Sequence, residues 1–197
     1  MINSNALPWI QAGYEIFALQ GPKGLKIEML ARKVGISKSS FYHHFADLDI
    51  FTEMLLEYHL EKTGELAIKV KSCKVMVPDC LLMLAEYNID HLFNRQLRNY
   101  RDNYAYQLCF ERATDMVLDE FIGIWAEMHG LTNHPQIAKS VLKVVTEIFY
   151  HRITPETLTY EWMVAFLYEM NDFIQGVIKS SGVASQLRTE KQDRAIT

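Results

Sequence analysis

Residues 26–45 read KIEMLARKVGISKSSFYHHF, and this stretch decides how the N-terminal part of the chain folds. Its pattern predicts two short helices, residues 26–33 and 38–45, separated by a tight break at residues 34–36. Gly35 tolerates the left-handed backbone that such a turn requires, and Ser37, directly before the second helix, is a good N-cap. The stretch therefore predicts a helix-turn-helix.

The side chains of this stretch divide into an inner and an outer set. A small residue is needed where the helices cross, and Ala31 lies four positions before Gly35. The apolar residues expected to lock the second helix onto a core are Leu30, Val34, Ile36 and Phe41. The outward residues of the second helix all carry groups that donate hydrogen bonds to phosphates or base edges: Lys38, Ser39, Ser40, Tyr42 and His43.

Charge is unevenly distributed along the chain. The formal net charge of all 197 residues is −4. Residues 22–45 contain five Lys or Arg and one Glu, a balance of +4, so the remainder carries −8. A surface that attracts a polyanion is therefore confined to the predicted helix-turn-helix, and the rest should be held away from DNA. The plain alternative is that residues 22–45 form only a solvated helical corner.

Composition excludes several classes of protein. With 49% hydrophobic residues but only nine Gly and five Pro, the chain suits an all-α fold better than a β-rich one. No apolar run approaches the ~18 residues of a membrane span, and the start does not read as a secretory signal, so a cytoplasmic location is expected. Cys73, Cys80 and Cys109 are odd in number and never spaced C-x-x-C, which argues against a disulfide framework or a thiolate zinc site.

Apolar periodicity predicts helices along the rest of the chain. The first covers residues 9–20, and the fourth is capped by Asp47 or Asp49 and runs to about Val70. Because the fourth helix begins within the apolar pattern of the N-terminal part, the two parts should move together. The later predicted helices run from Pro78 to about Asn94, on through residues 95–110, from Met116 to Gly130, from 133 to 148, and from 154 to near Gly182.

The stretch from Ile10 to Phe51 resembles the TetR family of bacterial transcriptional regulators, most specifically in ISKSSFYHHF at residues 36–45. Leu30-Ala31 and Val34-Gly35 precede this run in the family's order and spacing. The resemblance covers about the first quarter of the chain. It implies an N-terminal three-helix helix-turn-helix DNA-binding domain, residues 1–46, a larger helical domain for effector binding and dimerisation, residues 47–185, and a polar tail, residues 186–197.

The resemblance also implies a homodimer on a palindromic operator in double-stranded DNA. Its two recognition helices would enter successive major grooves, roughly 34 Å apart. Lys38 and Ser39 are the candidate base readers, and Glu28 has the chemistry to accept a hydrogen bond from cytosine N4. The residues expected at the DNA are Lys26, Glu28, Ser37, Lys38, Ser39, Ser40, Tyr42 and His43.

Two features depart from the family pattern. Where the family commonly has Lys early in the fourth helix, this chain has Leu48, flanked by Asp47 and Asp49, which repel phosphate. The start of the second helix reads KIE at residues 26–28 instead of carrying Ser or Thr. We therefore expect weak nonspecific binding with a shallow salt dependence. The alternative function is a helical protein-interaction module that has lost specific DNA binding.

In the resembled family the larger domain encloses a small-molecule pocket, and ligand binding changes the separation of the DNA-binding heads. The pocket residues predicted here are Tyr100, Tyr104 and Gln107 on one helical face, with Trp125 and Met128 as an apolar wall. Such a lining favours an apolar or amphipathic effector, oriented by a Tyr hydroxyl or by Arg98 or Arg101. The alternative is that these side chains are ordinary core and solvated surface.

The hairpin of the last two helices, residues 135–182, is the predicted dimer face. Its candidate interface residues are Val141, Val145, Ile148, Trp162, Phe166 and Phe173. No enzyme is indicated, because the chain has no Gly-rich phosphate loop, nucleophile elbow or paired metal-binding histidines. No cofactor or metal is expected, although an effector metal at Glu127, His129 and His134 is a minor alternative.

Overall fold

The computed structural model describes residues 4–180, and within them the only regular elements are helices. This confirms the predicted all-α fold class. The elements are α1 (Leu7–Gln20), a 3₁₀ turn (Pro22–Gly24), α2 (Ile27–Val34), α3 (Lys38–His44), α4 (Leu48–Ser72), a π-helical segment (Met76–Cys80), α5 (Leu81–Ala85), α6 (Asn88–Asn99), α7 (Tyr104–Met128), α8 (Pro135–Arg152) and α9 (Tyr160–Ser180). No helix in this part of the chain combines the length and apolarity needed to cross a membrane.

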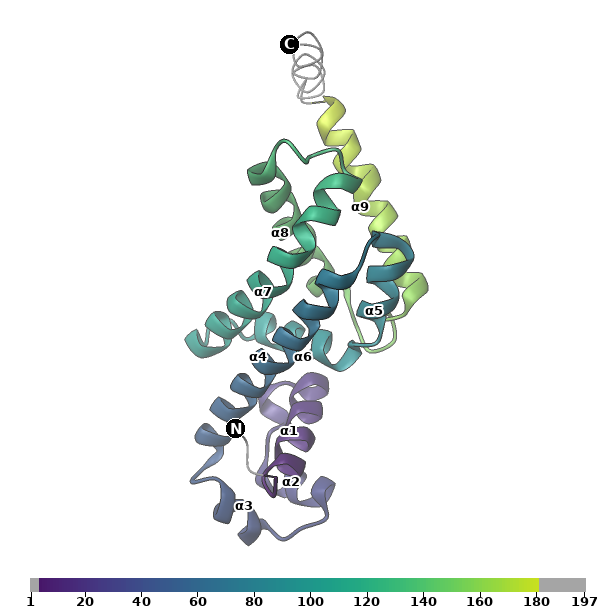
Figure 1. The fold of residues 1–197 in the computed structure, drawn as a ribbon. Helices are drawn as coiled ribbons and strands as arrows, with labels where there is room; N and C mark the ends of the chain where they lie inside the picture. Colours follow the sequence, from purple (N-terminus) through teal and green to yellow (C-terminus); the bar gives the residue numbers. More distant parts are fainter. Residues whose placement is uncertain (1–3, 181–197) are drawn as a thin grey trace.

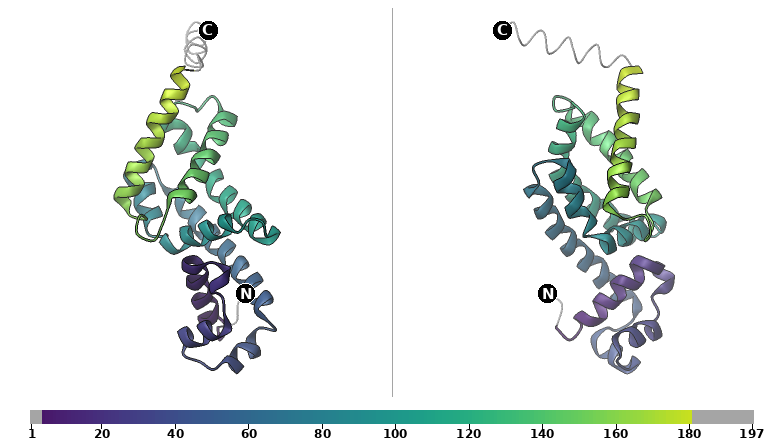
Figure 2. Two further views of the ribbon diagram at one scale, coloured as in Figure 1. Left: turned by 180° about the vertical axis from the view of Figure 1, so that it is seen from behind. Right: turned by 90° about the vertical axis from the view of Figure 1, so that its right-hand side faces the viewer.

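The molecule is elongated, with α1, α2 and α3 gathered at one end (Figure 1). The long helix α4 leaves this end and runs into the larger group formed by α5–α9. Both further views show α1–α3 and the end of α9 at opposite extremes of the molecule (Figure 2). The surface of α3 therefore lies far from the outer half of α9.

An aromatic core holds the three N-terminal helices against α4. Phe41 of α3 packs edge-on against Trp9 of α1, with ring centroids 5.6 Å apart, and lies 4.9 Å from Phe45. Phe45 in turn meets Phe51 of α4 at 4.8 Å. All four side chains are buried, so α3 is fixed by burial of its inner face, as the apolar pattern predicts.

The approach of α1 to α4 depends on a glycine. A Cβ atom at Gly13 would lie 2.4 Å from Cζ of Phe51, closer than any real contact of this kind. Phe51 thereby fills a notch in α1, and α4 is part of the N-terminal core as well as of the second group of helices. This arrangement leaves no linker between the two groups.

The turn between α2 and α3 has the predicted backbone. Gly35 has φ +75°, in the left-handed region, and its N–H donates to the carbonyl of Ala31 at 2.9 Å. Ser37 occupies the N-cap position of α3, but its side chain makes no capping bond and instead pairs with Ser39 Oγ at 2.9 Å. Asp47, and not Asp49, caps α4 by accepting from the N–H of Ile50 at 2.8 Å.

Three predicted helix boundaries are wrong. The helix predicted over residues 78–110 is broken after Ala85 and again at residues 100–103. The second break is stable because Asn103 Oδ1 accepts from the N–H groups of Ala105 and Tyr106, at 2.9 and 3.3 Å, and so starts α7. The last helix begins at Tyr160 rather than at residue 154, because Thr154 and Thr157 bond to each other's backbone in a turn.

Candidate nucleic-acid interface and internal cavity

The outer face of α3 carries a row of polar side chains. Phe41 and Phe45 point into the core, whereas Tyr42 is 58% exposed although its ring meets Phe41 edge-on at 5.6 Å. Of the residues predicted at the DNA, Ser40 is half-buried, and the exposed ones are Lys26, Glu28, Ser37, Lys38, Ser39, Tyr42 and His43. These eight residues are called the reading surface below.

The reading surface contains an ion pair between its two helices. Lys38 Nζ donates to Glu28 Oε1 at 2.5 Å, and both side chains remain more than half exposed. The hydrogen bond from Lys38 lowers the pKa of the Glu28 carboxyl, so this residue is an anion at neutral pH. A second pair, Lys33 with Glu15 of α1, lies at 2.6 Å. Part of the positive charge counted between residues 22 and 45 is thus matched by nearby carboxylates.

The residues at the start of α4 stabilise the fold and present no positive charge. Leu48 is half-buried and packs against the apolar core, and Asp47 serves as the N-cap. An apolar side chain held this way makes no contact with a phosphate. The start of α4 therefore offers no cation to a phosphate, whereas Lys26 and Tyr42 of the reading surface are exposed.

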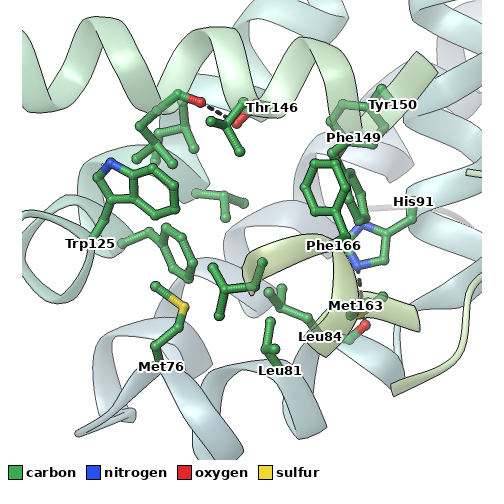
Figure 3. A pocket seen from close by; sticks show the side chains of 16 residues that line it. Met76, Leu81, Leu84, His91, Trp125, Thr146, Phe149, Tyr150, Met163 and Phe166 are labelled. Atoms are coloured by element: carbon green, nitrogen blue, oxygen red, sulfur yellow. Dashed lines mark hydrogen bonds between the residues drawn. The ribbon is translucent and has the colours of Figure 1, made fainter. Parts of the chain in front are cut away.

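A small internal cavity lies in the second group of helices (Figure 3). Its volume is about 120 Å³, and sixteen residues from the π-helical segment and α5–α9 line it. Four of these carry polar groups: His91, Thr146, Tyr150 and Trp125 with its indole N–H. Trp125 turns its six-membered ring, rather than its nitrogen, toward the other side chains drawn around the cavity (Figure 3), so the wall is apolar almost throughout.

Three of the four polar side chains around the cavity are paired, whereas the indole Nε1 of Trp125 is buried without a hydrogen-bond partner among the described residues. His91 Nε2 donates to the carbonyl of Leu84 at 3.1 Å, and Thr146 donates to its own helix. Asn94 Nδ2 donates to the hydroxyl of Tyr150 at 3.1 Å. Burial lowers the pKa of His91 and raises that of Tyr150, so both are neutral near pH 7. The cavity is therefore uncharged as well as apolar.

Only one of the predicted pocket residues lines this cavity. Trp125 does, whereas Tyr100, Tyr104, Gln107 and Met128 do not. Tyr104 is 76% exposed. The prediction that Tyr100 and Tyr104 share one helical face is wrong, because the turn at residues 100–103 separates them. Arg98, considered for an acidic effector, donates to Glu147 at 2.7 Å instead.

The predicted dimer residues fall into three groups by exposure. Val145 and Phe166 are buried and line the cavity, so they face inward within one subunit. Val141, Ile148 and Trp162 are half-buried. Phe173 of α9 is 60% exposed, as are Tyr168 of the same helix at 53% and Val144 of α8 at 56%. The apolar pattern predicted that all six residues avoid water. The spacing of apolar residues does not by itself distinguish a cavity wall from an outer apolar face.

A metal site is not formed by the described residues, which contain no cluster of three or more His, Cys, Asp or Glu with suitable placement. His129, considered for such a site, is buried and its ring packs 4.1 Å from that of Trp125. Burial lowers the pKa of His129. Its surroundings are those of a core side chain.

Comparison with known proteins bears on the N-terminal part. A family model described as "Bacterial regulatory proteins, tetR family" matches residues 10–47. A solved structure of a TetR-family transcriptional regulator from Mesorhizobium loti MAFF303099 is similar at 16% sequence identity and a TM-score of 0.46, over 83% of this chain and 95% of that one. This similarity is too low to carry an argument about function. No curated protein matches the chain.

Proposed function

We propose that this chain, whose residues 10–47 match the model of the TetR family of bacterial transcriptional regulators, represses transcription as a homodimer bound to a palindromic operator. A small, uncharged and largely apolar effector releases it. The observation that carries the proposal is the division of α3. Its aromatic inner face is buried between α1 and α4, and its outer face presents only polar side chains to solvent.

The reading surface suits the major groove. Lys38 and Ser39 lie on the first turn of α3 and are exposed, where a recognition helix presents its base-contacting residues. Lysine reads the O6 and N7 acceptors of guanine, and serine bonds to either base of a pair. Tyr42 and His43, one turn further on, have donors for phosphate oxygens.

The size of this surface and the outer face of α9 support a dimer. A recognition helix of seven residues covers a single half-site. Tyr168 and Phe173 of α9 and Val144 of α8 are exposed large apolar side chains, the kind of side chain that a twofold dimer buries. We place the dimer contact there, leaving the two reading surfaces to face the same side of a duplex.

The cavity supports a small apolar effector. Its volume of about 120 Å³ is close to the roughly 150 Å³ of an engineered apolar cavity that binds benzene. Larger effectors require the wall to move. To release the protein from DNA, the effector must bind the conformation that cannot bind DNA more tightly than the one that can. Shifting the ratio of these two conformations from 1:99 to 99:1 takes a difference of roughly 5.5 kcal/mol in binding free energy.

The proposal is tested by selecting DNA from a random double-stranded library with the full-length protein. The expected result is enrichment of an inverted repeat whose half-sites are centred about one helical turn apart. Lys38→Gln should lose preference at one position of each half-site, while Lys26→Gln should weaken all sequences equally. A library that emerges unenriched would contradict DNA recognition and favour the protein-interaction module.

Binding of an apolar effector in the cavity is tested with benzene as the probe. Benzene that occupies the cavity should raise the melting temperature of the wild-type protein by mass action. Val145→Phe places a ring in the cavity wall and should abolish that shift, whereas Ile137→Phe, also on α8 but exposed and outside the cavity lining, should not. Equal benzene shifts in the two variants would show that benzene binds elsewhere.

A further inference from the structure

All three cysteines are free thiols, and two of them lie together between α4 and α5. Cys73 is the C-cap of α4, and Cys80 is the last residue of the π-helical segment that leads into α5. The backbone turns back between them, because the N–H of Cys80 donates to the carbonyl of Val75 at 3.2 Å. This turn brings the side chains of Cys73 and Cys80 into contact.

The two thiols form a short chain of hydrogen bonds. The Cys73 thiol donates to the carbonyl of Lys69 at 3.6 Å, so its sulfur is left as an acceptor for Cys80. Burial, together with the contact with Cys73, raises the pKa of the Cys80 thiol to about 12, so Cys80 is neutral near pH 7. Thiols in contact are the starting geometry for a disulfide, whereas cysteines with distant Cα atoms need a movement of the backbone to be bridged.

The two thiols differ in their access to solvent. Cys80 is 0% exposed, whereas Cys73 is half-buried. A dissolved oxidant therefore reaches Cys73 first, and Cys80 is in place to react with the oxidised sulfur. A solvent-accessible thiol beside a second, resolving thiol is a common arrangement among cysteines that respond reversibly to oxidants.

The third cysteine has no part in this arrangement. Cys109 of α7 is buried, and its thiol donates to the carbonyl of Leu56 of α4 at 3.8 Å. Leu56 lies 17 positions before Cys73, which corresponds to about 25 Å along a helix that rises 1.5 Å per residue. Cys109 cannot reach Cys73 in the folded subunit, so it serves as an internal control.

We propose that Cys73 and Cys80 are an oxidisable thiol pair that hydrogen peroxide converts into an intramolecular disulfide. This site depends neither on DNA binding nor on an effector. The bridge closes a ring over residues 73–80, and this ring contains Met76, whose side chain lines the cavity. Oxidation therefore ties the end of α4 to the start of α5 beside the cavity wall.

The reaction balances with peroxide as the oxidant. The Cys73 thiolate attacks one peroxide oxygen, so an S–O bond forms, the O–O bond breaks and hydroxide leaves. The Cys80 sulfur then attacks the sulfenic sulfur of Cys73, so the S–S bond forms, the S–O bond breaks and a second hydroxide leaves. The two thiol protons convert both hydroxides to water. The high pKa of Cys80 slows the second step, and contact with its target sulfur offsets this.

The test treats the full-length protein with hydrogen peroxide near neutral pH. The remaining thiols are then alkylated in denaturant, and the tryptic peptides are mapped by mass spectrometry. In the wild type we expect the loss of two hydrogen atoms and one pair of peptides joined through Cys73 and Cys80, with Cys109 alkylated. Trypsin cuts after Lys74, so the two cysteines fall on separate peptides. Dithiothreitol should restore both thiols.

Three serine variants assign the roles of the two thiols. Cys109→Ser should form the bridge as the wild type does. Cys80→Ser should accumulate a sulfenic acid at Cys73 that dimedone traps, whereas the wild type should not, because Cys80 consumes this species. Cys73→Ser should leave Cys80 reduced, since Cys80 is buried. Melting curves confirm that each variant is folded, and the wild-type peptide map decides the bridge without them.

Several results would overturn the thiol pair. One is a wild type in which Cys73 is oxidised to a sulfinic acid while Cys80 is still alkylated. Others are a bridge that joins Cys73 of two subunits, and a protein that peroxide leaves with three free thiols. A wild type that selects no DNA sequence would overturn the proposed function alone, because the peptide map is read without DNA.

Discussion

Lys38 Nζ and Glu28 Oε1 lie 2.5 Å apart and join the two helices of the helix-turn-helix across its exposed side. The foremost cation of the reading surface is thus held by a carboxylate before any DNA is present. Binding to guanine or phosphate must compete with this pair, because Lys38 cannot direct the same N–H toward both partners.

Removing the Glu28 charge should strengthen DNA binding. In Glu28→Gln we expect a two- to fivefold gain in affinity at moderate salt and a steeper salt dependence, by about one unit of the logarithmic slope for one additional phosphate contact. Fluorescence anisotropy over a range of salt concentrations measures both. Glu15→Gln is the matched control, since Glu15 pairs with Lys33 at 2.6 Å, away from α3. Equal gains in the two variants would assign the effect to net charge and not to the release of Lys38.

The notch in α1 should be sensitive to a single methyl group. Gly13→Ala puts a Cβ 2.4 Å from the Phe51 ring, and overpacking of this kind costs about 1–3 kcal/mol. Gly123→Ala is the control, because a Cβ there meets nothing within 4 Å and alanine within a helix stabilises by about 0.5–1 kcal/mol relative to glycine. Urea denaturation should give opposite signs for the two variants. Two stabilising changes would show that Phe51 relaxes without strain.

Stability should fall in mild acid because of His59. Burial lowers its pKa from 6.5 in the unfolded chain to about 4, so between these values the unfolded chain binds more protons. The contribution of neutral His59 to the free energy of unfolding is therefore present above pH 6.5 and is lost as the pH falls toward 4. The expected loss between pH 6.5 and pH 5 is about 2 kcal/mol. The groups that act on the His59 ring are Tyr14, Lys62, Asp90, His91 and Asn94.

Thermal unfolding measured from pH 8 to pH 5 tests this expectation. His59→Asn should have lower stability at pH 8 but a flatter pH dependence than the wild type. His151→Asn, at an exposed position on α8, should keep the wild-type slope. Burial also lowers the pKa values of His91 and His129, so part of the slope should persist in His59→Asn. An unaltered slope in His59→Asn would place the acid sensitivity elsewhere.

The two phenylalanines of α9 should respond differently to a charge. Phe173→Glu alters a side chain that is 60% exposed, so the subunit should stay folded while the proposed dimer dissociates and operator binding is lost. Phe166→Glu buries a carboxylate in the wall of an apolar cavity and should destabilise the subunit itself. Light scattering after gel filtration, together with melting curves, separates the two effects. A Phe173→Glu protein that still elutes as a dimer would remove this part of α9 from the interface.

Local sequence pattern was sufficient for the N-terminal helices. Gly35, the apolar spacing of residues 30–41 and the polar run on the outside of α3 act over a few residues, so the helix-turn-helix was predicted to within one residue at most boundaries. The same stretch carried the family resemblance, and the match to residues 10–47 confirms it. The ion pair of Glu28 with Lys38 was missed, because it depends on the angle between two helices and not on their individual patterns.

Tertiary structure decided which neighbours the apolar faces of the last helices contact and which distant polar residues meet in the core. The apolar period predicted which residues of the last helices avoid water, but not whether Phe166 and Phe173 face the same neighbour. A helix of 21 residues is long enough to line a cavity in one part and to present an outer apolar face in another. The buried hydrogen bonds that link Tyr14, His59, Asn94 and Tyr150 join residues up to 136 positions apart. Such a meeting has no local signature, because it arises only when α1, α4, α6 and α8 pack around Phe93 and exclude the water that would otherwise pair with each group.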